Sequence, residues 1–231
     1  LADSDRQRRE FIANISHDLR TPLTSLLGYL ETLSLKSATL TPQEHQQYLA
    51  TALRQGQKVR HLSQQLFELA RLEHGGIKPQ RERFAMAELI SDVAQKFELT
   101  ARTREVNLHI DVPGPLPMVN ADVSMIERVV TNLLDNALKF GERAAIAIDV
   151  SSDSEVIIHI MDDGPGIPEA ELEAVLQPFY RVETSRNRDT GGTGLGLAIA
   201  AQLTAQLEGK LRLANRAGGG LDVAITLPRR S

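Results

Sequence analysis

The chain has 231 residues, with 26 Lys and Arg against 30 Asp and Glu and no Cys, and its formal net charge at pH 7 is −4. Its charges are spread along the chain, without a basic stripe that carries aromatic residues, which argues against nucleic acid as a partner. The lack of Cys excludes a disulfide framework and a thiolate metal site, and it fits a reducing compartment.

No apolar run approaches the roughly 18 residues that a membrane-spanning helix needs, and no signal-peptide pattern is present. We therefore expect a soluble polypeptide with a cytoplasmic location. Because the chain begins with Leu1 rather than Met, we also expect it to be an excised portion of a longer protein, which would contact a membrane only through segments outside it.

The composition changes along the chain and predicts two domains, residues 1–76 and 77–231. The first part is rich in Leu and Gln and has almost no strand signal, whereas β-branched runs, helices and glycine loops alternate in the second. A first helix is expected over 4–35, and a second helix from the turn over 36–42 to Gly75 and Gly76. Thr41 and Glu44 are spaced as a capping box at the start of that second helix.

Apolar residues recur along both helices at alternating steps of three and four. In the first helix Ile12, Leu19, Leu26 and Leu33 repeat every seven residues, which is typical of the inward seam of an amphipathic helix. A lone antiparallel hairpin leaves one side of each seam wet, so we expect two hairpins to form a dimeric four-helix bundle. The alternative is a hairpin that docks on the second domain of its own chain.

His17 faces away from this seam. At about 100° per residue it lies roughly 140° from the middle of the apolar stripe, with Asp18 beside it and Thr21 one turn further along the same outward face. An exposed imidazole beside a carboxylate is suited to nucleophilic chemistry. For this position taken alone, a solvated surface histidine is the alternative interpretation.

Residues 16–23 (SHDLRTPL) resemble the phosphoacceptor box of two-component sensor histidine kinases. The resemblance implies a homodimeric histidine-phosphotransfer domain in which His17 accepts a phosphoryl group. It also implies that Asp18, where the family often has Glu, acts as the base or orienter of the imidazole. Thr21 resembles the residue that positions water for dephosphorylation of the partner protein.

The second domain has the alternating pattern of an α+β fold. A polar segment, residues 151–154, and a glycine run, residues 218–220, each mark a β-hairpin. Helices are expected over 86–103, 122–140 and 198–208, a turn over 113–115, and strands over 82–85, 106–112, 144–150, 155–161, 210–213 and 221–227.

Three clusters in this domain carry candidate ligands, and the first is Asn132, Asn136 and Lys139 on one face of the helix over 122–140. Amide oxygens are hard ligands suited to Mg²⁺, which takes few protein ligands beside nucleotide phosphates. A lysine one turn on can meet phosphate charge. Asn132 and Asn136 are therefore the candidate metal ligands, and a solvated helix face is the alternative.

The second cluster, Asp162, Gly164 and Gly166, directly follows an apolar strand. A buried carboxylate there would accept a hydrogen bond from an exocyclic amine such as that of adenine, and glycines would let the backbone approach the base and ribose. An ordinary Asp-Gly turn is the alternative for so short a pattern.

The third cluster is a glycine loop, residues 191–197 (GGTGLGL), that opens the helix over 198–208. Its backbone N–H groups would form an anion site for phosphates. It is neither a P-loop nor a dinucleotide fingerprint, because no Gly-Lys-Ser/Thr closes it and a polar stretch stands where a strand would be required. The candidate phosphate ligands are Gly192, Thr193, Gly194, Leu195 and Gly196.

From residue 80 onward the pattern resembles the ATP-binding catalytic domain of the same kinases, an α/β sandwich shared with the gyrase, Hsp90 and MutL group. The polar stretch 181–190 resembles the family's ATP lid. Tyr180 and Arg181 resemble the aromatic box before the lid, for which a packed anchor is the alternative. In the wider group the position of Asn132 is usually a glutamate that activates water, and an amide cannot act as that base. The resemblance therefore leaves His17 as the nucleophile.

The whole resemblance implies ATP and Mg²⁺ as cofactors and ATP-dependent autophosphorylation of His17. Transfer to an aspartate of a separate response regulator would follow, with phosphatase activity toward that regulator. The alternatives are a non-catalytic, dimeric ATP-sensing scaffold and a serine kinase of the anti-sigma type. The intact clusters argue against the scaffold, and the hairpin that carries His17 argues against the serine kinase.

Overall fold

The computed structural model describes residues 2–73, 78–112, 118–152, 155–182 and 192–228. The chain divides into two compact units, residues 1–70 and 71–231. The domain boundary predicted between residues 76 and 77 lies outside the described residues and stays a prediction. Among the helices that the structure describes, none is both long enough and apolar enough to cross a membrane.

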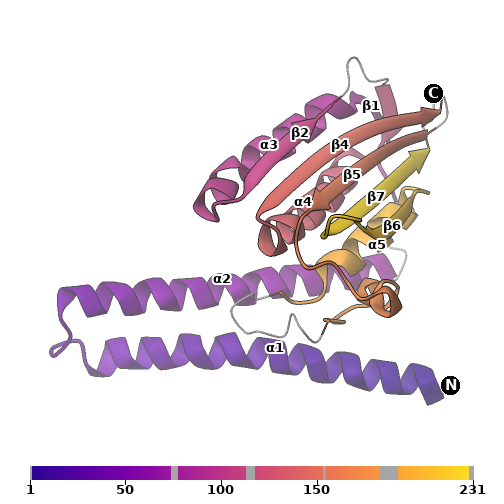
Figure 1. The fold of residues 1–231 in the computed structure, drawn as a ribbon. Helices are drawn as coiled ribbons and strands as arrows, with labels where there is room; N and C mark the ends of the chain where they lie inside the picture. The colour runs from indigo at the N-terminus through magenta and orange to yellow at the C-terminus, as the bar shows by residue number, and fades with distance from the viewer. Residues whose placement is uncertain (1, 74–77, 113–117, 153–154, 183–191, 229–231) are drawn as a thin grey trace. The chain divides into compact units, whose positions relative to one another are not determined.

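The first unit is an antiparallel pair of long helices, α1 (Ala2–Leu35) and α2 (Pro42–Glu73), joined by a short turn (Figure 1). The predicted capping box forms at the start of α2. The hydroxyl of Thr41 accepts the backbone N–H of Glu44 at 3.3 Å, and the Glu44 carboxylate accepts the backbone N–H of Thr41 at 2.9 Å. The bond from the Thr41 N–H, with a second from the Thr41 hydroxyl to the same carboxylate at 2.8 Å, holds the pKa of Glu44 below its usual value. The capping box fixes where α2 begins.

In the single chain, only one side of the predicted apolar seam lies between α1 and α2. Leu26 reaches to 4.0 Å from where a β-carbon on Gly56 would lie, and the rings of Tyr29 and Tyr48 are 5.7 Å apart. A second row remains open to solvent in the single chain. This row includes Ile12, Leu23, Leu27 and Leu30, with Leu27 52% exposed.

The second unit holds a five-stranded sheet in the order β2-β4-β5-β7-β6, and a separate antiparallel pair, β1-β3. In the larger sheet β2 runs parallel to β4, and the other neighbours are antiparallel. The strands are β1 (Glu82–Ala85), β2 (Asn107–Asp111), β3 (Met118–Ala121), β4 (Arg143–Ser152), β5 (Glu155–Asp162), β6 (Lys210–Asn215) and β7 (Leu221–Pro228).

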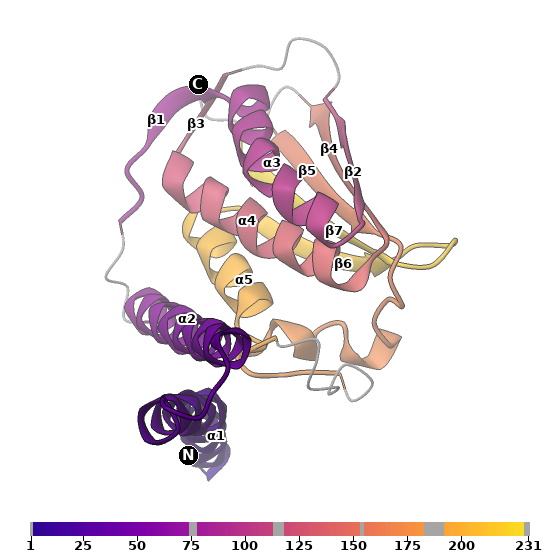
Figure 2. The same ribbon diagram turned by 90° about the vertical axis from the view of Figure 1, so that its left-hand side faces the viewer.

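Helices α3 (Met86–Thr103), α4 (Val123–Phe140) and α5 (Gly196–Gln206) cover one face of the larger sheet (Figure 2). Alternate residues of β5, Val156, Ile158 and Ile160, are buried under them, as expected for a strand whose successive side chains point to opposite faces. Single turns of 3₁₀ helix, η1 (Glu169–Glu171) and η2 (Ala174–Leu176), follow β5. The predicted α+β class is therefore confirmed.

The structure adds one strand that the sequence pattern did not predict. β3 follows the expected turn over 113–115, which lies outside the described residues, and pairs with β1 from Glu82 opposite Ala121 to Ala85 opposite Met118. Asp122 then caps α4 by accepting the backbone N–H of Met125 at 3.0 Å. A four-residue strand whose partner lies far away in the chain has too short a local pattern to be recognised.

Candidate active site

His17 lies on the exposed surface of α1, where its side chain keeps 76% of its accessible area. Its Nδ1 atom is 3.1 Å from Oδ1 of Asp18. A proton on Nδ1 is therefore held by the carboxylate, which leaves the lone pair on Nε2 free to act as a nucleophile. The hydroxyl of Thr21 donates to the backbone carbonyl of His17 at 3.3 Å. The structure thus brings these three predicted residues together, while their roles stay predictions.

Pro22 follows the site within the same helix. Having no N–H, it cannot donate the helical hydrogen bond to the carbonyl of Asp18. The backbone beside His17 is therefore less constrained than in an uninterrupted helix.

In the second unit, Asn132 is the most enclosed of the predicted ligands on α4. It is 7% exposed, and among the described residues its Nδ2 group has no hydrogen-bond partner. Leaving a buried donor unpaired costs about 1–3 kcal/mol. The amide therefore suits an acceptor from outside the chain, such as a phosphate oxygen or a water molecule.

Lys139 extends from α4 toward the glycine loop, and its Nζ atom lies against the position that a β-carbon on Gly192 would take. Burial lowers the pKa of Lys139 to about 8; the positive charges of Arg181 and Arg104 add to the shift, and Asp135 opposes it. Two further cations thus lie close enough to act on this ammonium. Such a gathering of positive charge favours an anion.

Asp162 ends β5 as a buried carboxylate. Its Oδ1 atom accepts the backbone N–H groups of Gly164, at 2.8 Å, and of Leu221, at 3.3 Å. Burial raises the pKa of Asp162 above its usual value, and these two hydrogen bonds oppose the rise. Since both bonds end on Oδ1, Oδ2 is the atom placed to accept an amine from a ligand.

The two predicted glycines after Asp162 are required by close packing of the chain on itself. A β-carbon on Gly164 would lie 2.6 Å from the backbone oxygen of Phe140, at the end of α4. Gly166 has a φ of 71°, and a β-carbon there would lie 2.6 Å from Oδ1 of Asn215. These glycines therefore seat the loop after β5 against α4 and the β6–β7 turn.

The glycine loop also lies beside α4, with Gly192 next to Lys139 and Gly196 next to Asn136. Gly194 has a φ of 70°, and its carbonyl accepts the backbone N–H of Phe179 at 3.0 Å. The hydroxyl of Thr193 accepts the N–H of Leu195, which is fully buried. α5 begins at Gly196, two residues before the expected start, so the loop leads directly into the helix and its first N–H groups.

Tyr180 donates its hydroxyl to Glu171 at 2.9 Å, next to the buried Phe179. This geometry favours the interpretation of a packed anchor before the stretch 181–190, which from residue 183 on lies outside the described residues.

The three predicted clusters thus converge within one unit. A β-carbon on Gly196 would lie 3.8 Å from Nδ2 of Asn136, while Gly164 packs against the end of α4. The described residues hold no group of three or more His, Cys, Asp or Glu able to bind a metal ion. A metal at Asn132 and Asn136 would therefore draw further ligands from phosphates and water, which is how Mg²⁺ is commonly held.

Two family models match the chain: the His Kinase A (phospho-acceptor) domain over residues 7–75, and the histidine kinase-, DNA gyrase B- and HSP90-like ATPase over residues 121–231. The sensor histidine kinase WalK of Bacillus subtilis is 33% identical over 228 residues, which are 97% of this chain and 37% of WalK. The chain belongs to the sensor histidine kinases. It spans little more than a third of that relative's length.

Solved structures of other histidine kinases share the fold of this one. That of AdeS from Acinetobacter baumannii has a TM-score of 0.75 at 25% identity and covers 93% of this chain and 98% of its own. The mycobacterial sensor histidine kinase MprB is 30% identical, with a TM-score of 0.55 over 65% of this chain and 98% of its own. The resemblance seen in the sequence is thereby confirmed.

Two residues that support the site of this histidine kinase were not recognised in its sequence. The side chain of Asn215 bonds to both backbone groups of Ile167, and Arg216 donates to the carbonyl of Asp162 at 2.9 Å. Both precede the glycine run of the β6–β7 hairpin. Two adjacent polar side chains at a turn were the only signal for them in the sequence. This signal is weak, because side chains at turns are usually solvated. The partners of Asn215 and Arg216 are also about 50 positions away in sequence.

Proposed function

We propose that this histidine kinase transfers the γ-phosphoryl group of ATP to His17 and then to an aspartate of a response regulator. The observation that carries the proposal is the exposed imidazole of His17, whose Nδ1 lies 3.1 Å from Asp18. The three converging clusters of the second unit are the proposed ATP site. We further propose the predicted domains, 1–76 and 77–231, as its phosphotransfer and catalytic parts.

In the first step, the Nε2 lone pair of His17 attacks the γ-phosphorus. A bond forms between nitrogen and phosphorus while the bond to the β,γ-bridging oxygen breaks, and ADP leaves. Asp18 holds the Nδ1 proton and stabilises the positive charge that develops on the ring. In this role it orients the imidazole and need not remove a proton from it.

In the nucleotide site, the Asp162 carboxylate accepts the exocyclic amine of adenine, and Lys139 meets phosphate charge together with the N–H groups that begin at Gly192. Asn132 and Asn136 would hold Mg²⁺, which neutralises charge on the phosphates when bound. Asn132 has no carboxylate with which to activate water. The site is therefore suited to a nucleophile from the chain, and ATP as donor fits a cytoplasmic location.

The open apolar row on α1 supports a homodimer. Leu27 and Leu30 are 52% and 45% exposed in the single chain, and burying the remaining half of each side chain contributes about 1 kcal/mol. A second hairpin that packs on this row would complete a four-helix bundle.

The phosphoryl group on His17 would pass to the response regulator's aspartate when a carboxylate oxygen attacks the phosphorus and the bond to Nε2 breaks. We propose that Thr21, one turn from the imidazole, orients water for the reverse dephosphorylation of that partner. A non-catalytic ATP-sensing scaffold has no chemical need of an oriented, exposed histidine, so it is the weaker candidate.

Incubation of the full chain with γ-labelled ATP and Mg²⁺ tests the proposal. The expected product carries acid-labile, base-stable label, and His17→Gln abolishes labelling while nucleotide affinity stays unchanged. His45→Gln, at another exposed position of the hairpin, is the matched control and labels normally. Label that persists in His17→Gln would exclude this residue as the acceptor, and ATP binding without any label would favour the scaffold.

A further inference from the structure

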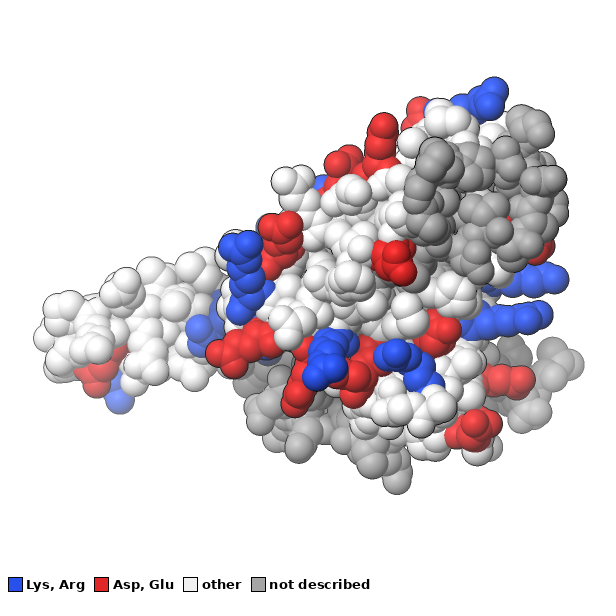
Figure 3. All heavy atoms as spheres, turned by 45° about the horizontal axis from the view of Figure 1, so that its top comes forward, with Lys and Arg blue, Asp and Glu red and all other residues white. Residues whose placement is uncertain are grey.

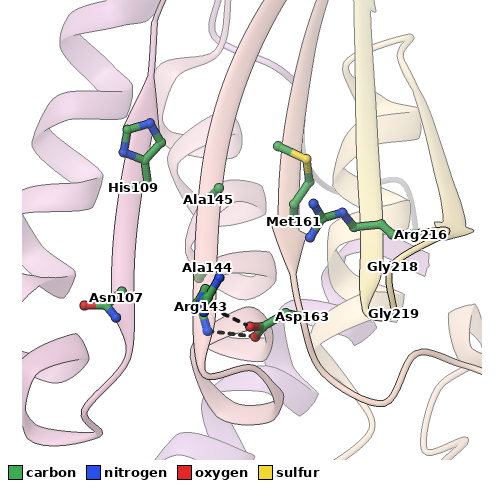
Figure 4. A pocket seen from close by; sticks show the side chains of 10 residues that line it. All are labelled: Asn107, His109, Arg143, Ala144, Ala145, Met161, Asp163, Arg216, Gly218 and Gly219. Carbon is green, nitrogen blue, oxygen red and sulfur yellow. Dashed lines mark hydrogen bonds and ion pairs between the residues drawn. The ribbon is translucent and has the colours of Figure 1, made fainter.

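A hollow of about 590 Å³ lies on the face of the larger sheet that the three helices leave open (Figure 4). The pairing of residues between neighbouring strands determines which side chains form its floor. Ala145 of β4 is paired with His109 of β2 on one side and with Met161 of β5 on the other. Since paired residues point to the same face, a methyl group stands between two long side chains, and this leaves a depression.

The hollow is separate from the proposed ATP site. Asp162 is buried toward the helices, and Met161 and Asp163, its neighbours in the chain, line the hollow on the opposite face. The two sites thus lie back to back across β5.

Two arginines give the hollow a net positive charge. Arg143 has a side chain that is 80% exposed, and Arg216 extends over Met161 from the far side (Figure 4). The one acidic side chain of the lining, Asp163, already accepts the backbone N–H groups of Glu142 and Arg143, at 2.8 and 2.7 Å. These bonds hold the pKa of Asp163 below its usual value, so it carries one negative charge against two positive ones.

Both guanidinium groups have donors to spare. Arg216 uses Nη1 to bond the carbonyl of Asp162 at 2.9 Å, and the Nε atom of Arg143 is 3.8 Å from Oδ2 of Asp163. A guanidinium has five N–H donors. Each arginine can therefore bind a further anion without giving up the contact that positions it.

Figure 3 shows one view of the surface, in which basic and acidic side chains of the described residues are interspersed. In the hollow, Arg143 and Arg216 stand at the edge of an apolar floor of Ala145 and Met161. Asp222, paired with Met161 beside this floor, bonds His159 at 3.0 Å. The volume of the hollow is within the range of small-molecule sites, about 300–1,000 Å³.

We propose that this hollow binds a small organic anion. Its carboxylate or phosphate group contacts Arg143 and Arg216, and its apolar body lies on Ala145 and Met161. Bidentate contact with planar carboxylates and phosphates is the chemistry that guanidinium groups favour.

Methionine methyl signals of the full chain provide the test, because the sequence has four Met residues. Met161 lines the hollow, whereas Met86 and Met125 are buried in the core and Met118 is exposed on β3. In chain labelled with [¹³C-methyl]methionine, phenyl phosphate and benzoate should each shift the Met161 signal saturably and leave Met118 unchanged. The two probes distinguish a phosphate from a carboxylate ligand, and phenol is the neutral comparison.

Arg143→Gln should weaken this binding about tenfold, the loss expected for one charge-assisted hydrogen bond. Arg212→Gln is the matched control, since Arg212 lies on the same face of the sheet, paired with Ala224, outside the hollow. The titration is repeated with ADP present. A Met161 signal that stays in place, responds equally to phenol, loses its response in simple competition with ADP, or weakens equally in Arg212→Gln would overturn the proposal.

Discussion

Burial on α4 makes the ammonium group of Lys139 unusually acidic, with a pKa of about 8. Below this pH the group is charged and can pair with phosphate; above it the group is neutral. Affinity for ATP should therefore fall as pH rises through about 8, by up to about tenfold per pH unit, until the contribution of the ammonium is lost. Calorimetric titration with ATP over this range would measure the slope.

Lys139→Arg keeps its charge at these pH values, so its affinity should not follow pH, and Lys139→Gln should bind weakly at every pH. The same slope in all three proteins would show that another group titrates.

We expect the buried amide of Asn132 to serve ligand binding and to lower the free energy of unfolding of the protein without nucleotide. Its buried Nδ2 group, unpaired among the described residues, makes Asn132→Leu an exchange of a polar for an apolar side chain of similar volume. We expect the variant to lose ATP binding and to gain about 1 kcal/mol in the free energy of unfolding, because the unpaired donor is removed. Urea unfolding without nucleotide checks the gain. A loss of stability would indicate that a water molecule satisfies the amide.

At the scale of secondary-structure elements, the turn after β5 depends on a close approach that only glycine permits. A β-carbon on Gly164 would lie 2.6 Å from the backbone oxygen of Phe140. Gly164→Ala should therefore displace the loop from the end of α4, lowering the free energy of unfolding by about 1–3 kcal/mol and weakening ATP binding. Gly218→Ala is the control, since a β-carbon there would meet nothing within 4 Å. Equal thermal shifts in the two variants would contradict this account.

Elements with a long local pattern could be predicted from the sequence, and the packing between distant segments could not. The period of the apolar residues placed α1, α2 and α4, and Thr41 with Glu44 marked where α2 begins. The ligand clusters were recognisable because each is contiguous or lies on one helix face. The hollow, by contrast, depends on which residues of β2, β4 and β5 are paired, and register between strands far apart in sequence leaves no local signal.

For the whole molecule, the exposed apolar row of α1 predicts that the chain is a dimer in solution. Leu27→Glu would place an unpaired charge in the buried interface, which is costly, so this variant should sediment as a monomer. Thr24→Glu, at an exposed polar position of the same helix, should leave the dimer intact. Sedimentation of the unmodified chain as a monomer at micromolar concentration would refute the four-helix bundle.

The bond from Arg216 to the carbonyl of Asp162 joins a residue of the hollow to the residue proposed to hold adenine. If an anion bound there strengthens or weakens this bond, it would also act on the backbone of the residue proposed to hold adenine. If an anion in the hollow changes the affinity for ATP by some factor, ATP must change the affinity for the anion by the same factor. Under such a coupling the two ligands would influence each other across the sheet without touching.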